Sequence, residues 1–101
     1  GIIINLLFNY GSRQEINDAV TKIKKLNKPS KDVRKYLYVP ESNDPDLIIR
    51  TGGEMRLSNF MLWQSAYSEL YFTKILWPDF KIKNLNNALD NYMKRKRKIG
   101  K

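Results

Sequence analysis

The sequence has 101 residues, 42% apolar and 12% aromatic, so it can build one hydrophobic core but not two domains. It contains neither cysteine nor histidine, which excludes disulfides, thiol nucleophiles, histidine acid–base chemistry and zinc sites of the usual kind. Its net charge of +9 favours anionic partners: nucleic acid, phosphorylated small molecules or anionic lipid.

The first predicted element is a strand within residues 1–10, a nearly continuous apolar run rich in β-branched isoleucine. Apolarity without alternation indicates a strand covered on both faces, as in a parallel α/β sheet. The run is too short to cross a bilayer and no secretory signal is visible, so we expect a cytoplasmic protein. Because the sequence opens on this run without an initiator methionine, we also expect it to be a piece of a larger protein.

Two helices are predicted next. Ser12 and Glu15 have the spacing of a capping box, which predicts Ser12 as the N-cap. Five apolar residues then recur at helical spacing and predict one buried face. They are Ile16, Ala19, Val20, Ile23 and Leu26. A second, short helix is predicted over residues 31–37.

The rest of the chain predicts two more strands and two more helices. The strands are expected over residues 46–50 and 70–73, with a short helix over 57–64 between them. Asn84 is predicted to cap the last helix, which has an apolar face. That face consists of Leu85, Ala88, Leu89, Tyr92 and Met93. The alternating order predicts a single partial α/β domain over residues 1–101, a mostly parallel sheet of about three strands flanked by three to four helices.

The segment RTGGEMRLS, residues 50–58, is the strongest candidate for a binding site. Ligands of parallel α/β sheets bind beyond the carboxyl ends of the strands, and Arg50 closes a strand at such an end. The two glycines that follow allow a sharp turn that brings backbone N–H groups near an anion. The sequence therefore predicts an anion-binding loop.

The side chains after these glycines favour a diphosphate as the anion. Arg56 supplies a second guanidinium, while Leu57 and Ser58 open the predicted helix, whose N-terminus offers free N–H groups. Two guanidinium forks, a hydroxyl and backbone amides suit the several oxygens of a diphosphate. In the alternative interpretation the glycines form a plain tight turn, and the arginines pair with surface acids such as Glu54.

Glu69 is the candidate metal ligand, because it immediately precedes a predicted apolar strand. A carboxylate at this place would hold a Mg²⁺ ion that bridges to the diphosphate. An ion pair between Glu69 and one of the arginines is the alternative, and spacing alone does not decide between them.

These blocks together resemble the C-terminal signature of the cis-prenyltransferases, the family of bacterial undecaprenyl diphosphate synthase. The resemblance spans nearly the whole chain and is densest around the arginine loop. It is carried by residues 9–13 (NYGSR), 44–54 (DPDLIIRTGGE), 56–60 (RLSNF), 63–64 (WQ), 66–72 (AYSELYF) and 77–80 (WPDF).

The resemblance implies a transferase that condenses isopentenyl diphosphate onto an allylic diphosphate and forms a cis double bond. It assigns isopentenyl diphosphate binding to Arg50, Arg56, Leu57 and Ser58, and a Mg²⁺ site to Glu69. It also implies a homodimer in the full-length protein and peripheral membrane contact through the polyprenyl product.

The family's catalytic aspartate loop and much of its product tunnel have no counterpart in this sequence. We therefore expect no catalytic residue in this chain, no activity of the chain alone, and no determinant of product length. The ending Arg97 to Gly100 resembles the family's Arg-x-Gly terminus with Lys98 in the arginine position, but a lysine lacks the bidentate fork.

Two alternative functions fit the same sequence. The first is a non-catalytic partner subunit of a prenyltransferase complex, although such a subunit has little need of both loop arginines. The second is a small basic nucleic-acid-binding domain. The aromatics lie in apolar runs and are not interleaved with the basic clusters, which is typical of a core and disfavours nucleic acid as a partner.

Overall fold

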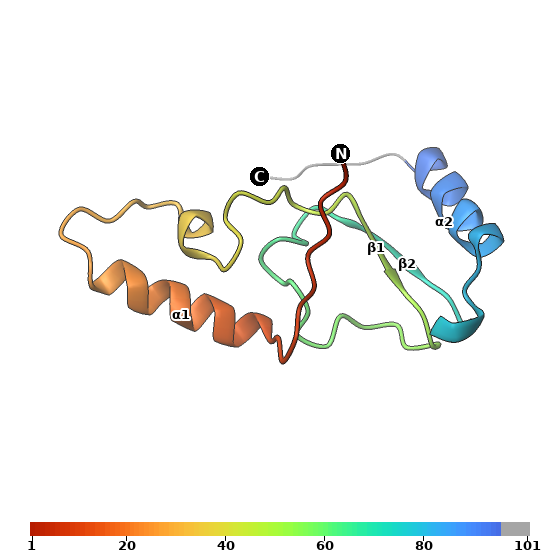
Figure 1. Cartoon of the computed structure of the whole chain (residues 1–101), viewed down its shortest axis with the longest axis horizontal. Coiled ribbons are helices and arrows are strands. Elements are labelled where there is room, and N and C mark those ends of the chain that lie inside the picture. Colours follow the sequence, from red (N-terminus) through yellow and green to blue (C-terminus); the bar gives the residue numbers. More distant parts are fainter. Residues whose placement is uncertain (96–101) are drawn as a thin grey trace. The chain divides into compact units, whose positions relative to one another are not determined.

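The computed structural model describes residues 1–95, which form two compact units. The first unit comprises Gly1–Asn43 and Ser58–Trp63, and the described part of the second comprises Asp44–Leu57 and residues 64–95. The elements, labelled in Figure 1 where there is room, are α1 (Ser12–Lys24), η1 (Val33–Tyr36), β1 (Leu47–Arg50), β2 (Glu69–Phe72), η2 (Trp77–Asp79) and α2 (Ile82–Lys94). Within the described residues, neither α-helix has the length and apolarity that a membrane span needs.

The second unit is built on a parallel pair of strands, β1 and β2. Their register runs from Leu47 opposite Glu69 to Arg50 opposite Phe72. All eight strand residues are half-buried. Both predicted strands and their parallel pairing are confirmed, and with them the α/β class.

The strand predicted within residues 1–10 is wrong for this structure. Residues 1–7 have no regular secondary structure, and Ile2, Ile3 and Ile4 are largely exposed, Ile2 at 92%. A strand requires a hydrogen-bonded neighbour, and the sheet of the described residues holds only β1 and β2. The apolar run therefore has the composition of a buried strand without the pairing that would make it one.

Helix α1 is confirmed, but its predicted N-cap is wrong, and two residues of its predicted buried face, Val20 and Leu26, are exposed at 45% and 47%. The N-cap is Gly11, which has no side chain to supply a capping hydrogen bond. Ser12 lies inside the helix, fully buried, where its Oγ accepts from Leu62 N at 2.9 Å. Asn59 caps the helix instead: its carbonyl oxygen accepts from Ser12 N at 2.8 Å and its Oδ1 from Arg13 N at 2.9 Å. The first N–H groups of α1 are thus satisfied by a residue far along the chain.

Replacing Asn59 by alanine removes the side-chain half of this cap. We expect the free energy of unfolding to fall by about 0.5–2 kcal/mol, the usual cost of losing an N-cap side chain. Urea denaturation followed by circular dichroism measures this. Asn27→Ala, an exposed asparagine in the same unit, is the matched control and should change stability by less than about 0.5 kcal/mol. Equal losses in the two variants would rule out the capping role.

The helix predicted over residues 57–64 is also wrong. Ser58, Asn59 and Met61 have φ angles of 50°, 68° and 48°, which a right-handed helix cannot contain. These left-handed residues turn the segment so that Asn59 reaches the start of α1. The segment thus caps α1 through Asn59 and does not form the helix that its local sequence pattern predicts.

Glu15, the other half of the predicted capping box, is a buried carboxylate at 2% exposure. It accepts from Tyr10 Oη at 2.5 Å and from Tyr38 N at 2.9 Å. The Tyr10 ring also packs edge-on against Tyr38 and Phe60, with centroids 6.4 and 5.7 Å away. Glu15 thus connects α1 by hydrogen bonds to Tyr10, which precedes the helix, and to Tyr38, which follows η1.

Burial and the hydrogen bond to Glu15 raise the pKa of Tyr10 to about 12. The hydrogen bond to Asp18 raises the pKa of Tyr38 to about 12 and lowers the pKa of Asp18. A raised folded-state pKa means that both tyrosines stabilise the fold at neutral pH. Their contribution is lost as the pH rises from the ordinary tyrosine value of 10.0 through about 12.

The remaining helical predictions are confirmed in part. The short helix expected over 31–37 is η1, capped by Asp32, whose Oδ1 accepts from Arg34 N at 3.1 Å. α2 begins earlier than expected, with Lys81 as N-cap. Asn84 lies inside the first turn, where its Oδ1 accepts from Lys81 N at 2.8 Å. Asn84 is therefore the third residue of the helix, and its side chain accepts a hydrogen bond from the backbone of the N-cap residue.

The predicted buried face of α2 is largely wrong. Ala88 is fully buried and Tyr92 half-buried, but Leu85, Leu89 and Met93 are exposed, Met93 at 78%. α2 packs against β2, and two four-residue strands cover only a narrow strip of the helix. Its apolar stripe is therefore wider than the surface available to bury it.

Candidate functional site

The loop after β1 is pinned to the segment after β2 by backbone hydrogen bonds. Thr73 N donates to Arg50 O at 3.0 Å and so continues the parallel ladder. Gly52 and Gly53 have φ angles of 93° and 87°, and their N–H groups donate to Ile75 O and Thr73 O, both at 3.0 Å. Both positions need glycine, because L side chains rarely adopt this conformation.

The glycine amides were expected to approach an anion, and here that expectation is wrong. Each is already paired with a carbonyl of the neighbouring segment, which satisfies it within the protein. Their role is to hold the loop in a fixed turn at the carboxyl end of β1. Recognition of an anion by this loop therefore depends on its side chains.

Both loop arginines have partners within the loop. The Arg50 guanidinium donates to the carbonyl oxygen of Arg56 and so closes the loop on itself. The Arg56 guanidinium pairs with Glu54 at 2.9 Å, and the two side chains are 69% and 54% exposed. Exposed ion pairs of this kind are worth little and exchange readily. The alternative interpretation, an Arg56–Glu54 pair on a tight turn, describes the loop as it stands in this structure.

Leu57 and Ser58 fall in different units of the structure. Leu57 is half-buried at the end of the segment that carries Arg50 and Arg56. Ser58 begins the stretch that caps α1, with φ 50°, and no helix starts there. The helix dipole expected to assist anion binding is therefore missing, while the ligand roles of both residues stay predictions.

Glu69, the predicted metal ligand, forms an ion pair with Arg95. Glu69 Oε2 lies 3.2 Å from Arg95 Nη1, which also donates to Leu70 O at 2.6 Å. Both side chains are partly buried, at 23% for Glu69 and 32% for Arg95. The predicted alternative, an ion pair, is thus present, but with an arginine at the end of α2 instead of the loop.

The strand register separates Glu69 from the arginine loop. Glu69 lies opposite Leu47 at the start of the parallel pair, while Arg50 lies opposite Phe72 at its end. Three residues of strand span about 10 Å. The structure therefore brings Arg50 and Arg56 together in one loop, and it places Glu69 at the other end of the sheet.

Glu69 has the oxygen donors that Mg²⁺ prefers, but it fits such an ion only in part. One carboxylate is one of about six ligands, and the described residues contain no group of three acidic side chains that would hold a cation. The ion pair with Arg95 also competes for the same oxygen. A Mg²⁺ ion at Glu69 would need its other ligands from substrate phosphates, water or further protein groups.

Three residues around these sites were not predicted from the sequence. Thr73 and Ile75 receive the glycine amides, and Arg95 holds Glu69. Nothing in the sequence points to Arg95, which is 26 positions from its partner. Thr73 directly follows β2, and this place at the carboxyl end of a strand is the one feature of the sequence that could have pointed to a contact with the loop.

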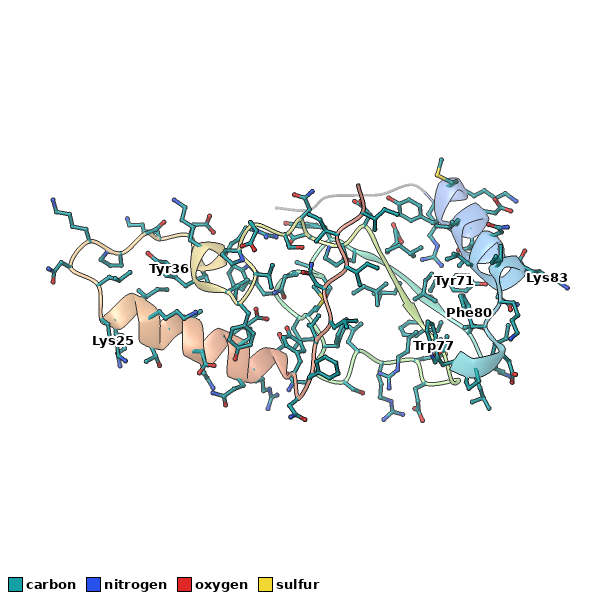
Figure 2. The ribbon with its side chains drawn as sticks, in the orientation of Figure 1. Lys25, Tyr36, Tyr71, Trp77, Phe80 and Lys83 are labelled. Carbon is teal, nitrogen blue, oxygen red and sulfur yellow. The ribbon has the colours of Figure 1, made fainter. Side chains whose placement is uncertain are left out.

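The second unit also has an apolar cavity of about 360 Å³. It is lined by Ile49, Thr51, Trp77, Phe80, Lys81, Ile82 and Leu85. Trp77 and Phe80, labelled in Figure 2, stack with ring centroids 6.4 Å apart. Successive strand residues point to opposite faces, so Ile49 faces this cavity while Arg50 points away from it. The cavity therefore adjoins the arginine loop through Thr51, but the Arg50 side chain does not face it.

Comparison with known proteins shows the family. The sequence model of the undecaprenyl diphosphate synthase family matches residues 1–100, nearly the full length of the chain. This chain belongs to the undecaprenyl diphosphate synthase family of prenyltransferases. The family resemblance seen in the sequence is thereby confirmed.

Individual members of this family are similar to the chain along most of its length. Isoprenyl transferases of Thermotoga maritima and Fusobacterium nucleatum are 56% and 55% identical over 94% and 98% of the chain. A crystal structure of a probable undecaprenyl diphosphate synthase from Campylobacter jejuni matches 91% of the chain with a TM-score of 0.77 and 36% identity.

A second solved structure is lavandulyl diphosphate synthase from Lavandula x intermedia, in complex with dimethylallyl diphosphate. It matches 88% of the chain with a TM-score of 0.80 and 39% identity. The chain spans 44% of the length of the two isoprenyl transferases and 42–44% of the two solved chains. These matches confirm the α/β prenyltransferase fold for the part of it that is present.

Proposed function

We propose that this chain carries the isopentenyl diphosphate half-site of a cis-prenyltransferase, which condenses that substrate onto an allylic diphosphate. The observation that carries the proposal is the arginine loop: two arginines at the carboxyl end of a parallel strand, joined by the hydrogen bond from the Arg50 guanidinium to the Arg56 carbonyl oxygen, in a chain of the prenyltransferase family. One structural neighbour was solved with dimethylallyl diphosphate, itself an allylic diphosphate.

In this proposal the arginines neutralise the diphosphate of isopentenyl diphosphate and fix its orientation. Arg56 exchanges Glu54 for phosphate oxygens, which costs little because the existing pair is exposed. Arg50 would exchange its protein partners, Arg56 O among them, for phosphate oxygens, which suit a guanidinium fork. Leu57 and Ser58 extend the site through a backbone amide and a hydroxyl.

The proposed cofactor is Mg²⁺, with Glu69 as the one ligand that this chain contributes. When bound, the ion would stabilise negative charge on the oxygens of a departing diphosphate. Glu69 would leave its ion pair with Arg95 to bind the metal, just as Arg56 would leave Glu54 to bind phosphate. We assign no catalytic residue to this chain, so the groups that break and form bonds belong to the rest of the active site.

The remaining parts of the proposal concern the whole protein. We propose a homodimer in the cytoplasm that contacts the membrane peripherally through its polyprenyl product. The basic run Lys94 to Lys98 continues past residue 95, where the described residues end. The Arg-x-Gly-like ending lies wholly outside the described residues. Their expected role at a partner's active site stays a prediction.

The proposed function is tested by titrating the 101-residue chain with isopentenyl diphosphate in a calorimeter. We expect saturable binding at one site per chain, and no polyprenyl product when an allylic diphosphate and Mg²⁺ are added. Product formation by the purified chain would contradict the assignment of catalysis to other parts of the protein. Absence of any saturable binding would contradict the half-site itself.

A further inference from the structure

The first unit contains a dense basic segment that the proposed half-site does not use. Residues 22–35, here called the lysine segment, hold seven basic residues and one acid, a net charge of +6 out of +9 for the whole chain. The lysines are Lys22, Lys24, Lys25, Lys28, Lys31 and Lys35, all of them exposed. Figure 1 shows the segment turning back from the end of α1 into η1, and Figure 2 labels Lys25 at that end of the helix.

Helix stability explains only part of this charge. Lys22 and Lys24 lie in the last turn of α1, where cations interact favourably with the helix dipole. That effect fades within one turn, so it gives no reason for Lys28 and Lys31, and Lys35 lies only in the last turn of the four-residue helix η1. Little of the charge is neutralised: none of the six lysines forms an ion pair within residues 1–95, although Lys22 lies close enough to Asp18 to help lower the pKa of that carboxyl. The one acid of the segment, Asp32, caps η1.

From this surface we infer that the lysine segment docks the protein onto membranes that contain anionic lipid. An apolar side chain lies in the middle of the segment, since Leu26 is 47% exposed between Lys25 and Lys28. Lysines around an exposed leucine form the combination that binds an anionic bilayer surface, with ammonium groups at the headgroups and the leucine at the acyl boundary.

The same residues fit nucleic acid poorly. The single arginine of the segment, Arg34, donates through Nη1 to Ser42 O at 2.8 Å and so binds within the protein. The segment contains no aromatic residue, and Tyr36, which directly follows it, is half-buried, with its hydroxyl accepting from Ser30 N at 2.6 Å. A base would thus find no exposed ring to stack on within residues 22–35. Flexible lysine ammonium groups suit a fluid layer of headgroups better than a fixed phosphate geometry.

The test is co-sedimentation of the 101-residue chain with vesicles of phosphatidylcholine, alone or mixed with phosphatidylglycerol. We expect binding to the mixed vesicles only, and weaker binding as salt rises. Each lysine near an anionic surface strengthens binding roughly fivefold, so Lys25→Glu with Lys28→Glu should weaken it by about 25-fold or more. Leu26→Asn should weaken it by about threefold to tenfold.

Two control variants carry the same change of charge elsewhere. Lys74→Glu with Lys83→Glu alters exposed lysines of the other unit, and we expect a change below about threefold. Lys96→Glu with Lys98→Glu alters the C-terminal basic run. Circular dichroism checks that each variant keeps its helices.

Equal loss in all three double variants would mean that net charge alone drives binding, and would overturn the assignment to the lysine segment. Loss in the C-terminal variant alone would do the same. Tighter binding to a random oligonucleotide than to anionic vesicles would assign the segment to nucleic acid. None of these measurements uses enzymatic activity or isopentenyl diphosphate, so failure of this proposal and failure of the half-site are distinguishable.

Discussion

Replacing Glu15 by alanine is expected to lower the free energy of unfolding by about 2–4 kcal/mol. The buried carboxylate accepts hydrogen bonds from Tyr10 Oη and Tyr38 N, and each donor left unsatisfied costs about 1–3 kcal/mol. The half-buried Tyr10 hydroxyl recovers part of this by turning to water, whereas the backbone N–H of Tyr38 has no such freedom. Denaturant unfolding monitored by circular dichroism measures the loss.

Two further variants separate this role from a general effect of substitution in α1. Glu15→Gln keeps the shape and one acceptor oxygen, and the Tyr10 hydroxyl can accept from the new amide, so we expect a loss of about 1 kcal/mol. Asn17→Ala changes an exposed position of the same helix and should cost less than about 0.5 kcal/mol. A loss for Glu15→Ala no larger than that for Asn17→Ala would show that the buried carboxylate does not anchor α1.

Arg50→Ala is expected to weaken binding of isopentenyl diphosphate by about 1.5–3 kcal/mol, or roughly 10- to 150-fold. The variant removes a guanidinium and also the hydrogen bond that closes the loop on Arg56 O. Arg50→Lys keeps the charge without the fork and should fall between alanine and wild type. Calorimetric titration measures all three affinities.

The matched control is Lys74→Ala, which removes a positive charge from an exposed position next to Thr73. It should change the affinity by less than about threefold, because exposed charges that do not contact the ligand are screened by salt. If Arg50→Ala and Lys74→Ala weaken binding equally, the contribution of Arg50 is long-range charge and not contact.

The parts of the fold that follow from local sequence were predicted well. β1 and β2 are short apolar runs of β-branched and aromatic residues, and their pairing follows from the order of elements. α1 and α2 follow from helical periodicity within each segment. The information that identifies each helix or strand lies within about a dozen neighbouring residues.

The parts that failed depend on distant residues. Ser12 looked like an N-cap because the sequence does not reveal that its hydroxyl accepts from Leu62 N, 50 positions away. The segment after the arginine loop looked helical because nothing local announces the left-handed residues that bring Asn59 to α1. Gly11 shows how close this contact is, since an added Cβ would lie 2.9 Å from Asn59 Nδ2.

The candidate site divides in the same way. A strand end, two glycines and two arginines are contiguous in sequence, so the loop and the proximity of Arg50 to Arg56 were predictable. The use of the glycine amides by Thr73 and Ile75 was not, and neither was the Glu69–Arg95 pair. Both require knowledge of which segments lie side by side.

The central claim is that the loop from Arg50 to Leu57 binds the diphosphate of isopentenyl diphosphate. It is tested most directly by nuclear magnetic resonance of the isotope-labelled chain during titration with that ligand. The predicted result is saturable shifts of the backbone amides from Thr51 to Ser58, abolished in the double variant Arg50→Ala with Arg56→Ala. Shifts confined to the lysine segment, or undiminished in the double variant, would contradict it.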